Sequence, residues 1–570
     1  MKKITTLIFI SVISLFGVKS FAAFTQMWMA QYQHTTANNF SSESRKVVED
    51  AAGNIYMLSD ATSNLDSTGV IAGGTHHYAV INKYSAGGLR LHRKAIEVFN
   101  HVVSGFDNLG SYGLEIDANA NLYMGYTPYN TVSNYNVAVA KYDSTLNRIW
   151  VSQYGTNTSD VGLDMKLATS GLVYFLVKTV NGGSTTYSIQ RTNSGNAPTM
   201  VYTFAPNTEV INSIALAPNE DIYATGYKTV GGVKSILMMG FNHTNLFPKW
   251  TTIYNGGIVA GDDVGNMITV GADGNVYAVG TSTQASNVGT DVVILKHPAA
   301  AGTKLSWASF QNYSTADAGS FISVPEVDYA YVGGTTGNIA GPLGNNILLY
   351  RIKITSVPGT QTATVYRPVP TNLHTSVSGI TLNGMKISSS KRVYITGGIT
   401  STDMSGQVFS ALFLAKFSVV FGNALSLTYA APCRGDFTNN LKGTGLALDY
   451  GKSDIYWICD NWNNNSNHQQ EFAQLYDMDV SSPLREAAME PSNSISVSVF
   501  PNPASEKITI RSEDLISSVQ LSDLTGRVVK SVLSGDSEVE INIADLKKGL
   551  YICSVTSQKG EVNITKIFVE

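Results

Sequence analysis

Residues 262–310 read DDVGNMITVGADGNVYAVGTSTQASNVGTDVVILKHPAAAGTKLSWASF, and this stretch indicates the architecture of most of the chain. It contains four short apolar runs that are separated by turn-forming residues. Residues 272–275, Ala-Asp-Gly-Asn, form the clearest turn, because glycine adopts the positive φ of a tight hairpin without steric cost. Four such runs in succession predict a four-stranded antiparallel meander.

The same pattern recurs along the chain, each time around a tyrosine in the second apolar run. These tyrosines are Tyr56, Tyr123, Tyr174, Tyr223, Tyr277, Tyr331, Tyr394 and Tyr456. A repeat of roughly fifty to sixty residues with four strands is typical of a propeller blade. The sequence therefore predicts an all-β chain with a β-propeller over residues 24–480. Eight tyrosines favour eight blades, with seven as the alternative.

Three smaller features recur within these repeats. The third apolar run, for example residues 79–84, contains a Lys or Arg, which we expect to mark where the strand leaves the core for solvent. A glycine often follows the tyrosine, where we expect the strand to leave the sheet close to another backbone. These glycines are Gly125, Gly226, Gly280, Gly333 and Gly397. The acids Asp107, Asp160, Asp263 and Asp317 share one repeat position, which indicates a structural role.

The two ends of the repeat region predict how it closes. Residues 25–32, TQMWMAQY, are similar to fourth-strand sequences such as residues 149–154 but precede any complete repeat. The last repeat ends with a third-strand pattern at residues 472–476. We therefore expect the N-terminal strand to complete the last blade, which would cover both free edges.

Composition and the N-terminus indicate an exported protein. Charged residues make up 14% of the chain, and the net charge of −4 comes without a basic cluster, which argues against nucleic acid as a partner. Lys2 and Lys3 precede an apolar run at residues 7–18, as in a secretory signal peptide over residues 1–22. No later segment is long and apolar enough to span a bilayer, so we expect no transmembrane segment in the mature chain.

A different module follows the repeats. Residues 481–493 contain Ser-Ser-Pro and Glu-Pro-Ser and are typical of a linker. Residues 494–570 contain a Pro-Asn-Pro motif and a series of short strand patterns. The last of these, at residues 564–569, should cover a sheet edge and bury Ile567, with Val569 as a second candidate.

Both regions are similar to known families. The order Asp-x-Gly, Asp-Gly-Asn-Val-Tyr, x-Val-Gly, Asp-Val-Val-Ile-Leu-Lys and Ser-Trp resembles the bacterial β-propeller repeat family labelled SBBP. The Pro-Asn-Pro opening, the Asp-x-x-Gly-Arg hairpin at residues 523–527 and Lys-Gly-Leu-Tyr at residues 548–551 resemble the type A C-terminal sorting domain of type IX secretion, found in Bacteroidetes. This second resemblance implies a small β-sandwich that engages the type IX secretion machinery. The mature protein would then be released or attached to the cell surface.

The sequence predicts no catalytic residue, cofactor site or metal site. No Gly-x-Ser-x-Gly, His-Glu-x-x-His or phosphate-loop motif occurs. His76 and His77 could touch a metal, but a histidine pair on a loop is usually solvated. Residues 117–121 begin like a calcium loop, yet they lack its central Gly and distal Glu and coincide with a repeat turn.

Two short features remain ambiguous. Residues 434–436, Arg-Gly-Asp, spell an integrin-type tripeptide, although three-residue matches are common by chance. Cys433 and Cys459 fall in one repeat of the sequence pattern and could form a disulfide or stay free. Cys553 lies in an alternating strand pattern and is expected to be a buried thiol.

The most unusual polar patch lies at residues 460–468. There Asp460, Trp462 and His468 could bind a sugar by stacking and hydrogen bonding, and a plain polar loop is the alternative. The leading functional prediction is a secreted or surface-displayed propeller that binds a glycan or protein ligand. The alternatives are an enzyme acting on polysaccharide or peptidoglycan and a structural protein of the cell envelope. Convergence of acidic residues from several blades would favour the enzyme.

Overall fold

Strands account for all the regular secondary structure in the described residues of the computed structural model. The model describes residues 24–477 and 497–570, apart from 34–40, 66–70, 86–88, 100–110, 132–133, 157, 257–260, 284–288, 301, 303–306, 312–315, 338–345, 355–363, 367–373, 389–390, 404–407, 420–424, 434–440, 449–453, 464–466, 524–527 and 559–561. The chain forms two compact units, Met1–Val480 and Ser481–Glu570.

The first unit consists of antiparallel groups of four strands that follow one another along the chain. The first four groups are β2 (Ser41–Glu49), β3 (Ile55–Leu65), β4 (Ile71–Tyr84) and β5 (Arg90–Phe99); β6 (Ser111–Ile116), β7 (Leu122–Tyr126), β10 (Val137–Tyr142) and β11 (Arg148–Tyr154); β12 (Ser159–Leu167), β13 (Val173–Asn181), β14 (Ser184–Thr192) and β15 (Thr199–Thr203); and β16 (Glu209–Leu216), β17 (Ile222–Val230), β18 (Val233–Phe241) and β19 (Pro248–Tyr254). A small hairpin, β8 (Tyr129–Thr131) and β9 (Asn134–Tyr135), lies within the second group's sequence.

Three further groups have the same strand order. They are β20 (Asp263–Val270), β21 (Val276–Thr283), β22 (Thr290–His297) and β23 (Trp307–Gln311); β24 (Ala316–Glu326), β25 (Tyr329–Gly337), β26 (Asn346–Lys353) and β27 (Thr364–Tyr366); and β28 (His374–Ile387), β29 (Val393–Asp403), β30 (Val408–Val419) and β31 (Leu425–Cys433). One parallel pair, Thr290 with Ala316, joins the groups that begin with β20 and β24 into a single eight-stranded sheet.

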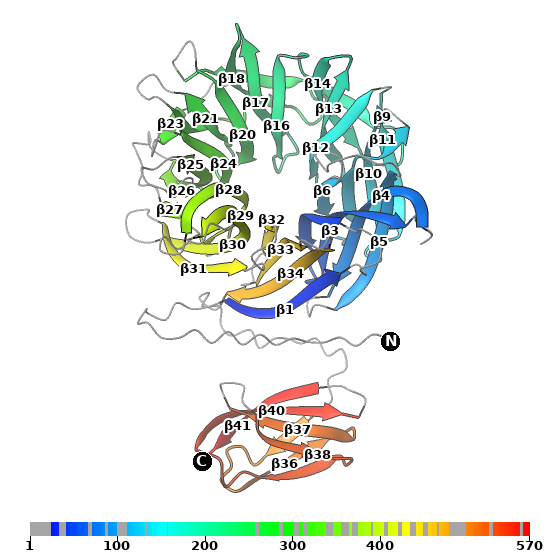
Figure 1. Cartoon of the computed structure of the whole chain (residues 1–570), viewed down its shortest axis with the longest axis vertical. Coiled ribbons are helices and arrows are strands. Elements are labelled where there is room, and N and C mark those ends of the chain that lie inside the picture. The colour runs from blue at the N-terminus through cyan, green and yellow to red at the C-terminus, as the bar shows by residue number, and fades with distance from the viewer. Residues whose placement is uncertain are drawn as a thin grey trace. The chain divides into compact units, whose positions relative to one another are not determined.

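The last group confirms the predicted closure. It contains β32 (Leu441–Leu448), β33 (Asp454–Asn463) and β34 (Asn467–Asp477), and its fourth strand is β1 (Phe24–Gln33) from the start of the chain. β1 and β34 pair antiparallel along their length, and Figure 1 shows blue β1 beside orange β34. The N-terminal strand thus covers the edge that β34 would otherwise expose.

The first strand of each group contacts the first strands of its neighbours. These contacts run in the order β2, β6, β12, β16, β20, β24, β28, β32 and back to β2. Figure 1 shows the groups side by side around a common centre, with these strands on the inside. The apolar cores lie between neighbouring groups; one of them, for example, joins Tyr174 and Ile189 to Ile222 and Leu237.

Every one of these inner strands contains a register irregularity at the same repeat position. One residue of the inner strand is skipped between paired positions: Arg45, Tyr112, Leu163, Asn212, Asn266, Ser320, Asn383 and Thr444. A bulge of this kind bends a strand and increases its twist. The second strand therefore passes close to the inner strand's backbone at this position.

The bulge explains the glycines that follow the tyrosines. A Cβ on Gly226 would lie 1.9 Å from the Val210 carbonyl oxygen, and one on Gly280 would lie 2.0 Å from the Val264 oxygen. The expected close backbone approach is confirmed at these sites. The expectation that the strand leaves the sheet there is wrong, because Gly280 stays paired with both Gly265 and Val293.

Gly280→Ala should therefore destabilise the first unit by about 3 kcal/mol, at the upper end of overpacking costs, because the clash involves backbone that cannot rotate away. Chemical denaturation would measure this. Gly195→Ala is the matched control, since its Cβ would find its nearest atoms at 3.4 Å. Equal stability of the two variants would contradict the proposed role of the bulge.

The second unit contains two antiparallel sheets that share one apolar core. The strands are β35 (Val497–Phe500), β36 (Lys507–Ser512) and β39 (Glu538–Asn542) in one sheet, and β37 (Ile516–Ser522), β38 (Val528–Leu533), β40 (Gly549–Ser557) and β41 (Val562–Val569) in the other. Ile567 and Val569 on β41 are buried in this core, as predicted. Cys553 is a free, buried thiol, also as predicted.

The Pro-Asn-Pro motif holds the last strand in place. The Asn502 side chain donates to the Lys566 carbonyl oxygen at 2.7 Å and accepts a hydrogen bond from the Phe568 amide at 2.8 Å. Backbone bonds from Ala504 N to the Phe568 oxygen and from Glu570 N to the Ala504 oxygen continue this contact. The start and the end of the second unit are therefore joined along the outer edge of β41.

Candidate functional site

The repeat tyrosines are built into a recurring contact between an acid and a cation. In the group that begins with β20, the Tyr277 hydroxyl donates to Asp273 at 2.6 Å. Lys296 lies directly across the strand pair from Tyr277 and forms an ion pair with Asp273 at 3.0 Å. The side chains of Asp273, Tyr277 and Lys296 thus link the turn between β20 and β21 to strands β21 and β22 of the same sheet.

Other groups repeat this arrangement. In the group that begins with β24, Glu326 accepts from Tyr331 at 2.5 Å and pairs with Arg351 at 3.2 Å. The cross-strand cations Lys83, Arg351 and Lys416 are buried, with at most 8% of their surface exposed. The expectation that these cations mark the exit of a strand to solvent is therefore wrong. Their alkyl chains and charges pack over tyrosines inside the sheet stack.

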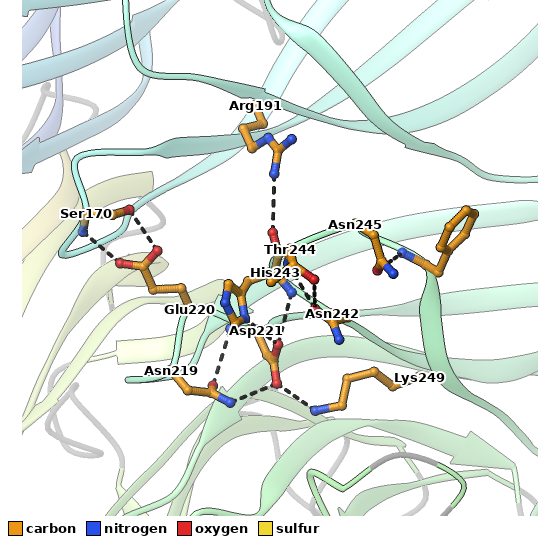
Figure 2. Close-up of polar contacts among 11 residues, drawn as sticks. Ser170, Arg191, Asn219, Glu220, Asp221, Asn242, His243, Thr244, Asn245 and Lys249 are labelled. Carbon is orange, nitrogen blue, oxygen red and sulfur yellow. Dashed lines mark hydrogen bonds and ion pairs between the residues drawn. The ribbon is translucent and has the colours of Figure 1, made fainter.

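The group that begins with β16 departs from this pattern, and Figure 2 shows the polar contacts around its acid, Asp221. Gly240 stands opposite Tyr223, where other groups have the cation, and the Trp250 ring covers it. Lys249, from the outer strand β19, supplies the charge instead and bonds to Asp221 at 2.6 Å. The cation thus comes from a different strand, and the acid lies two residues before the tyrosine in sequence, whereas Asp273 lies four residues before Tyr277.

Asp221 is the centre of this polar network. Besides Lys249, it accepts hydrogen bonds from the Asn219 side chain at 2.8 Å and from the His243 amide at 3.0 Å. Burial opposes ionisation, but these donors outweigh it and hold the pKa of Asp221 below its ordinary value. The carboxylate is fully engaged, so this network is best explained as a structural one.

The neighbouring carboxylate connects two groups. Glu220 accepts hydrogen bonds from the Ser170 amide and hydroxyl, both at 2.7 Å, and from the Thr169 hydroxyl at 2.9 Å. Arg191 donates from the same side to the His243 carbonyl oxygen at 3.2 Å. These contacts tie the β12–β15 group to the β16–β19 group.

A buried histidine lies at the next junction. The Trp250 ring stacks between Tyr223, at 5.8 Å, and His297, at 3.7 Å. His297 Nδ1 lies 2.7 Å from the Pro298 carbonyl oxygen, so this nitrogen carries the proton, and Nε2 has no partner in the described residues. Burial lowers the pKa of His297, and the hydrogen bond to Pro298 offsets this only in part.

We expect His297 to make stability depend on pH. Its folded pKa is below the unfolded value of 6.5, so the unfolded chain takes up the proton first. The contribution of neutral His297 to the free energy of unfolding is complete above pH 6.5. It is lost as the pH falls below this value, by at most about 1.4 kcal/mol per pH unit. Chemical denaturation at pH 7.5 and 5.5 would measure this. Between these pH values the free energy of unfolding should fall less for His297→Phe than for the natural chain. Exposed His92 provides the control, and a His92→Phe variant with the same reduced loss would contradict this assignment.

The acids that open the repeats are structural, as predicted. Asp160 and Asp263 are buried and accept hydrogen bonds within their own groups, Asp160 from the Thr179 hydroxyl and Asp263 from the Ser282 hydroxyl, both at 2.5 Å. Asp317 is also buried, and Asp107 lies outside the described residues. In the described region these acids are buried within the fold and are not available to a ligand.

A different set of charges gathers on the inner strands. We call Lys46, Glu115, Asp164, Lys166 and Lys386 the axial cluster; they come from β2, β6, β12 and β28. Lys46 and Lys386 are exposed to solvent, and the other three are half-buried. Four sheets thus contribute charged residues from their first strands, which contact one another around the first unit.

These residues occupy two register positions relative to the repeat tyrosine of their group. Glu115, Lys166 and Lys386 each lie directly opposite the repeat tyrosine of their own group. Lys46 and Asp164 occupy the equivalent position two residues earlier. The sequence contains this signal, since aligning the repeats on the tyrosine brings Glu115, Lys166 and Lys386 to the same position, eight residues before it.

The axial charges influence one another. Lys166 donates to Asp164 at 2.7 Å, and this acid keeps the pKa of Lys166 raised although burial opposes it. Burial raises the pKa of Glu115 despite the nearby positive charges of Lys166 and Lys46. The Lys386 side chain is accessible to solvent, but the surrounding protein reduces its hydration, and this effect and then the positive charge of Lys46 lower its pKa. The side chains therefore lie within electrostatic range of each other across the inner strands.

The predicted sugar-binding residues lie on a hairpin. Asp460 and Trp462 belong to β33, and His468 belongs to β34, so the expectation of a loop over residues 460–468 is wrong for these three positions. Trp462 and His468 are direct cross-strand partners, whereas Asp460 pairs with Gln470. The hairpin thus brings two of the three residues together, and their side chains lie outside the described part of the structure.

Other sequence candidates have clear positions. Asp117 accepts hydrogen bonds from the Asn119 and Asn121 amides, both at 2.9 Å, which confirms the predicted turn. His76 and His77 lie within strand β4 rather than on a loop, and Arg434-Gly435-Asp436 falls outside the described residues.

The prediction that Cys433 and Cys459 lie in the same repeat is wrong. Cys433 ends β31, the outer strand of one group, whereas Cys459 lies on β33 of the next group. Their side chains lie outside the described part of the structure.

Metal-binding clusters and membrane-spanning helices are both absent from the described residues. No group of three or more His, Cys, Asp and Glu side chains is arranged to hold a metal ion. None of the described segments forms a helix of the length and apolarity needed to cross a membrane.

The C-terminal unit matches a known family. Residues 498–570 fit the model described as "Secretion system C-terminal sorting domain". The chain therefore carries a type IX sorting tail, which engages the type IX secretion machinery. This tail marks the protein for export through the periplasm to the cell surface or the medium.

Solved structures offer only distant likenesses. PorZ, a surface component of the type IX secretion system of Porphyromonas gingivalis, is 14% identical, with 93% of this chain and 70% of PorZ covered and a TM-score of 0.35. The polysaccharide lyase Uly1 is 10% identical, with 67% of this chain and 93% of the lyase covered and a TM-score of 0.38. Likenesses this weak carry no argument about activity. No curated protein matches the sequence.

Proposed function

We propose that this protein is a secreted or cell-surface binding module, built as an eight-bladed β-propeller of the SBBP type. The closed cycle of inner-strand contacts and the pairing of β1 with β34 support the propeller. The proposed organisation has a signal peptide at residues 1–22, the propeller at 24–480, a linker at 481–493 and the sorting domain at 494–570. The division of the chain after residue 480 supports these boundaries.

The axial cluster is the observation that carries the binding function. The repeat acids and the Asp221 network are occupied by internal hydrogen bonds, whereas the side chains of Glu115, Lys46 and Lys386 have no hydrogen bond or ion pair within the described residues. Charged groups without partners in a protein are costly unless solvent or a ligand satisfies them. The fold therefore leaves these charges available at its centre.

An enzyme is the second candidate, and Glu115 is the reason. Its raised pKa is a property of general acids, and Asp164 is a second carboxylate from a neighbouring sheet. Two acids thus converge, which was the feature expected of the enzyme. Three lysines accompany them, however, and Asp164 is already bonded to Lys166, so binding is the better-supported function.

A glycan array probed with the mature chain, residues 24–570, tests the proposal, with hydrolysis products assayed in parallel. We expect retention of specific glycans without product formation. Lys46→Met with Lys386→Met tests the axial cluster, and Trp462→Ala tests the hairpin site of Asp460, Trp462 and His468. Product formation that disappears in Glu115→Gln would establish the enzyme, and an array without any bound glycan would contradict glycan binding.

A further inference from the structure

The axial cluster has an uneven distribution of charge. Lys166 and Asp164 satisfy each other at 2.7 Å, so this pair is close to neutral. The remaining members are two lysines and one glutamate. The strongest electrostatic neighbour of Lys386 is Lys46, a like charge, and no acid lies within ion-pairing distance of either lysine in the described residues. Two ammonium groups within electrostatic range repel each other, and an anion bound between them would offset this repulsion.

The strand that contacts both lysine-bearing strands has small, uncharged residues at the equivalent register positions. Lys386 is on β28 and Lys46 is on β2, and β32 contacts both strands. At the register position equivalent to Lys46, β32 has Gly445, and at the position equivalent to Lys386 it has Ala447. Neither residue has a side chain that could reach across to neutralise a lysine.

We propose that the axial cluster binds an oxyanion, a carboxylate or phosphate group, between Lys46 and Lys386 in front of β32. The ammonium groups donate hydrogen bonds to the oxyanion and relieve their own repulsion. Glu115 lies within electrostatic range of both lysines, so its carboxylate weakens binding of an anion and restricts the site to ligands of low charge. This inference names the ligand chemistry of the proposed binding module and rests on that proposal.

Isothermal titration calorimetry on residues 24–570 tests the site at constant ionic strength. Sodium glucuronate and inorganic phosphate are the two anionic probes, and glucose and sodium chloride are the neutral and simple-salt controls. We expect saturable binding of at least one anionic probe and none of the controls. Binding of glucuronate alone identifies an acidic sugar as the source of the oxyanion, and binding of phosphate alone identifies a phosphorylated ligand.

Variants assign the binding to the named residues. Lys46→Met and Lys386→Met should each weaken binding at least tenfold, whereas Lys46→Arg and Lys386→Arg should retain it. Lys353→Met is the matched control, because Lys353 is exposed on β26 outside the cluster. Glu115→Gln should tighten binding several-fold, an effect that a merely structural role of Glu115 would not produce.

The proposal is overturned if neither anion binds, or if the methionine variants bind as tightly as Lys353→Met. A positive glycan array together with unchanged methionine variants would reject this oxyanion site alone and leave the binding function in place. A negative array with lysine-dependent anion binding would reject glycans as ligands and retain the site.

Discussion

A chain that starts at residue 34 should be far less stable than one that starts at residue 24. The missing strand β1 forms nine register pairs with β34. Each net hydrogen bond contributes about 0.5–1.5 kcal/mol, so the loss should be on the order of 5 kcal/mol before side-chain packing is counted. Thermal melting of the two chains would measure it. The loss should be larger than for any single substitution in the first unit, because an entire sheet edge becomes exposed.

A peptide of residues 24–33, added in trans, provides the control for this deletion. It should restore much of the lost stability, because it supplies the same pairing with β34. A scrambled peptide of the same composition should have no effect. Unchanged melting after the deletion would mean that β1 does not close the first unit.

Disrupting the last strand should stop the protein from reaching the outside of the cell. Ile567 is completely buried in the core of the second unit, and β41 forms one side of its four-stranded sheet. Ile567→Asp puts a charge into this core, which costs several kcal/mol and should unfold the sorting domain. The first unit has its own cores and should still fold. The variant should therefore collect in the periplasm of a host that has the type IX machinery.

Lys566→Asp is the matched control for this variant. Lys566 is the preceding residue of β41, and its side chain is exposed, while its carbonyl oxygen keeps the bond from Asn502. The Lys566→Asp variant should reach the surface or the medium in the same amount as the natural chain. Cell fractionation with antibodies against the first unit would compare the two. Equal amounts of both variants outside the cell would contradict a need for the folded tail.

Local patterns in the sequence predicted the strands well. The eight repeat tyrosines all lie in the second strand of a four-stranded group, because a tight turn followed by alternating apolar residues specifies its own hairpin. The expected pairing of the N-terminal segment with the last group was correct for a similar reason. A fourth-strand sequence without its own sheet, and a third strand without a fourth, have only each other as partners.

Predictions about single side chains failed where the answer depended on a neighbouring strand. Lys416 was expected to mark an exit to solvent, but it is buried opposite Tyr394. Cys433 and Cys459 belong to different groups, because the boundary between groups falls between the end of β31 and the start of β32. Trp462 was expected on a loop, although it continues β33 into pairing with His468.

The sequence by itself determined the all-β architecture, the repeat and the C-terminal sorting tail, because hydrophobic periodicity and turn chemistry act over a few residues and are written in order along the chain. Only the tertiary structure brought Lys46, Glu115 and Lys386 together, since they are separated by 340 positions from first to last and meet through the cycle of inner strands. Electrostatic interactions depend on distance in space and not on distance in sequence. The candidate site is therefore a property of the closed fold.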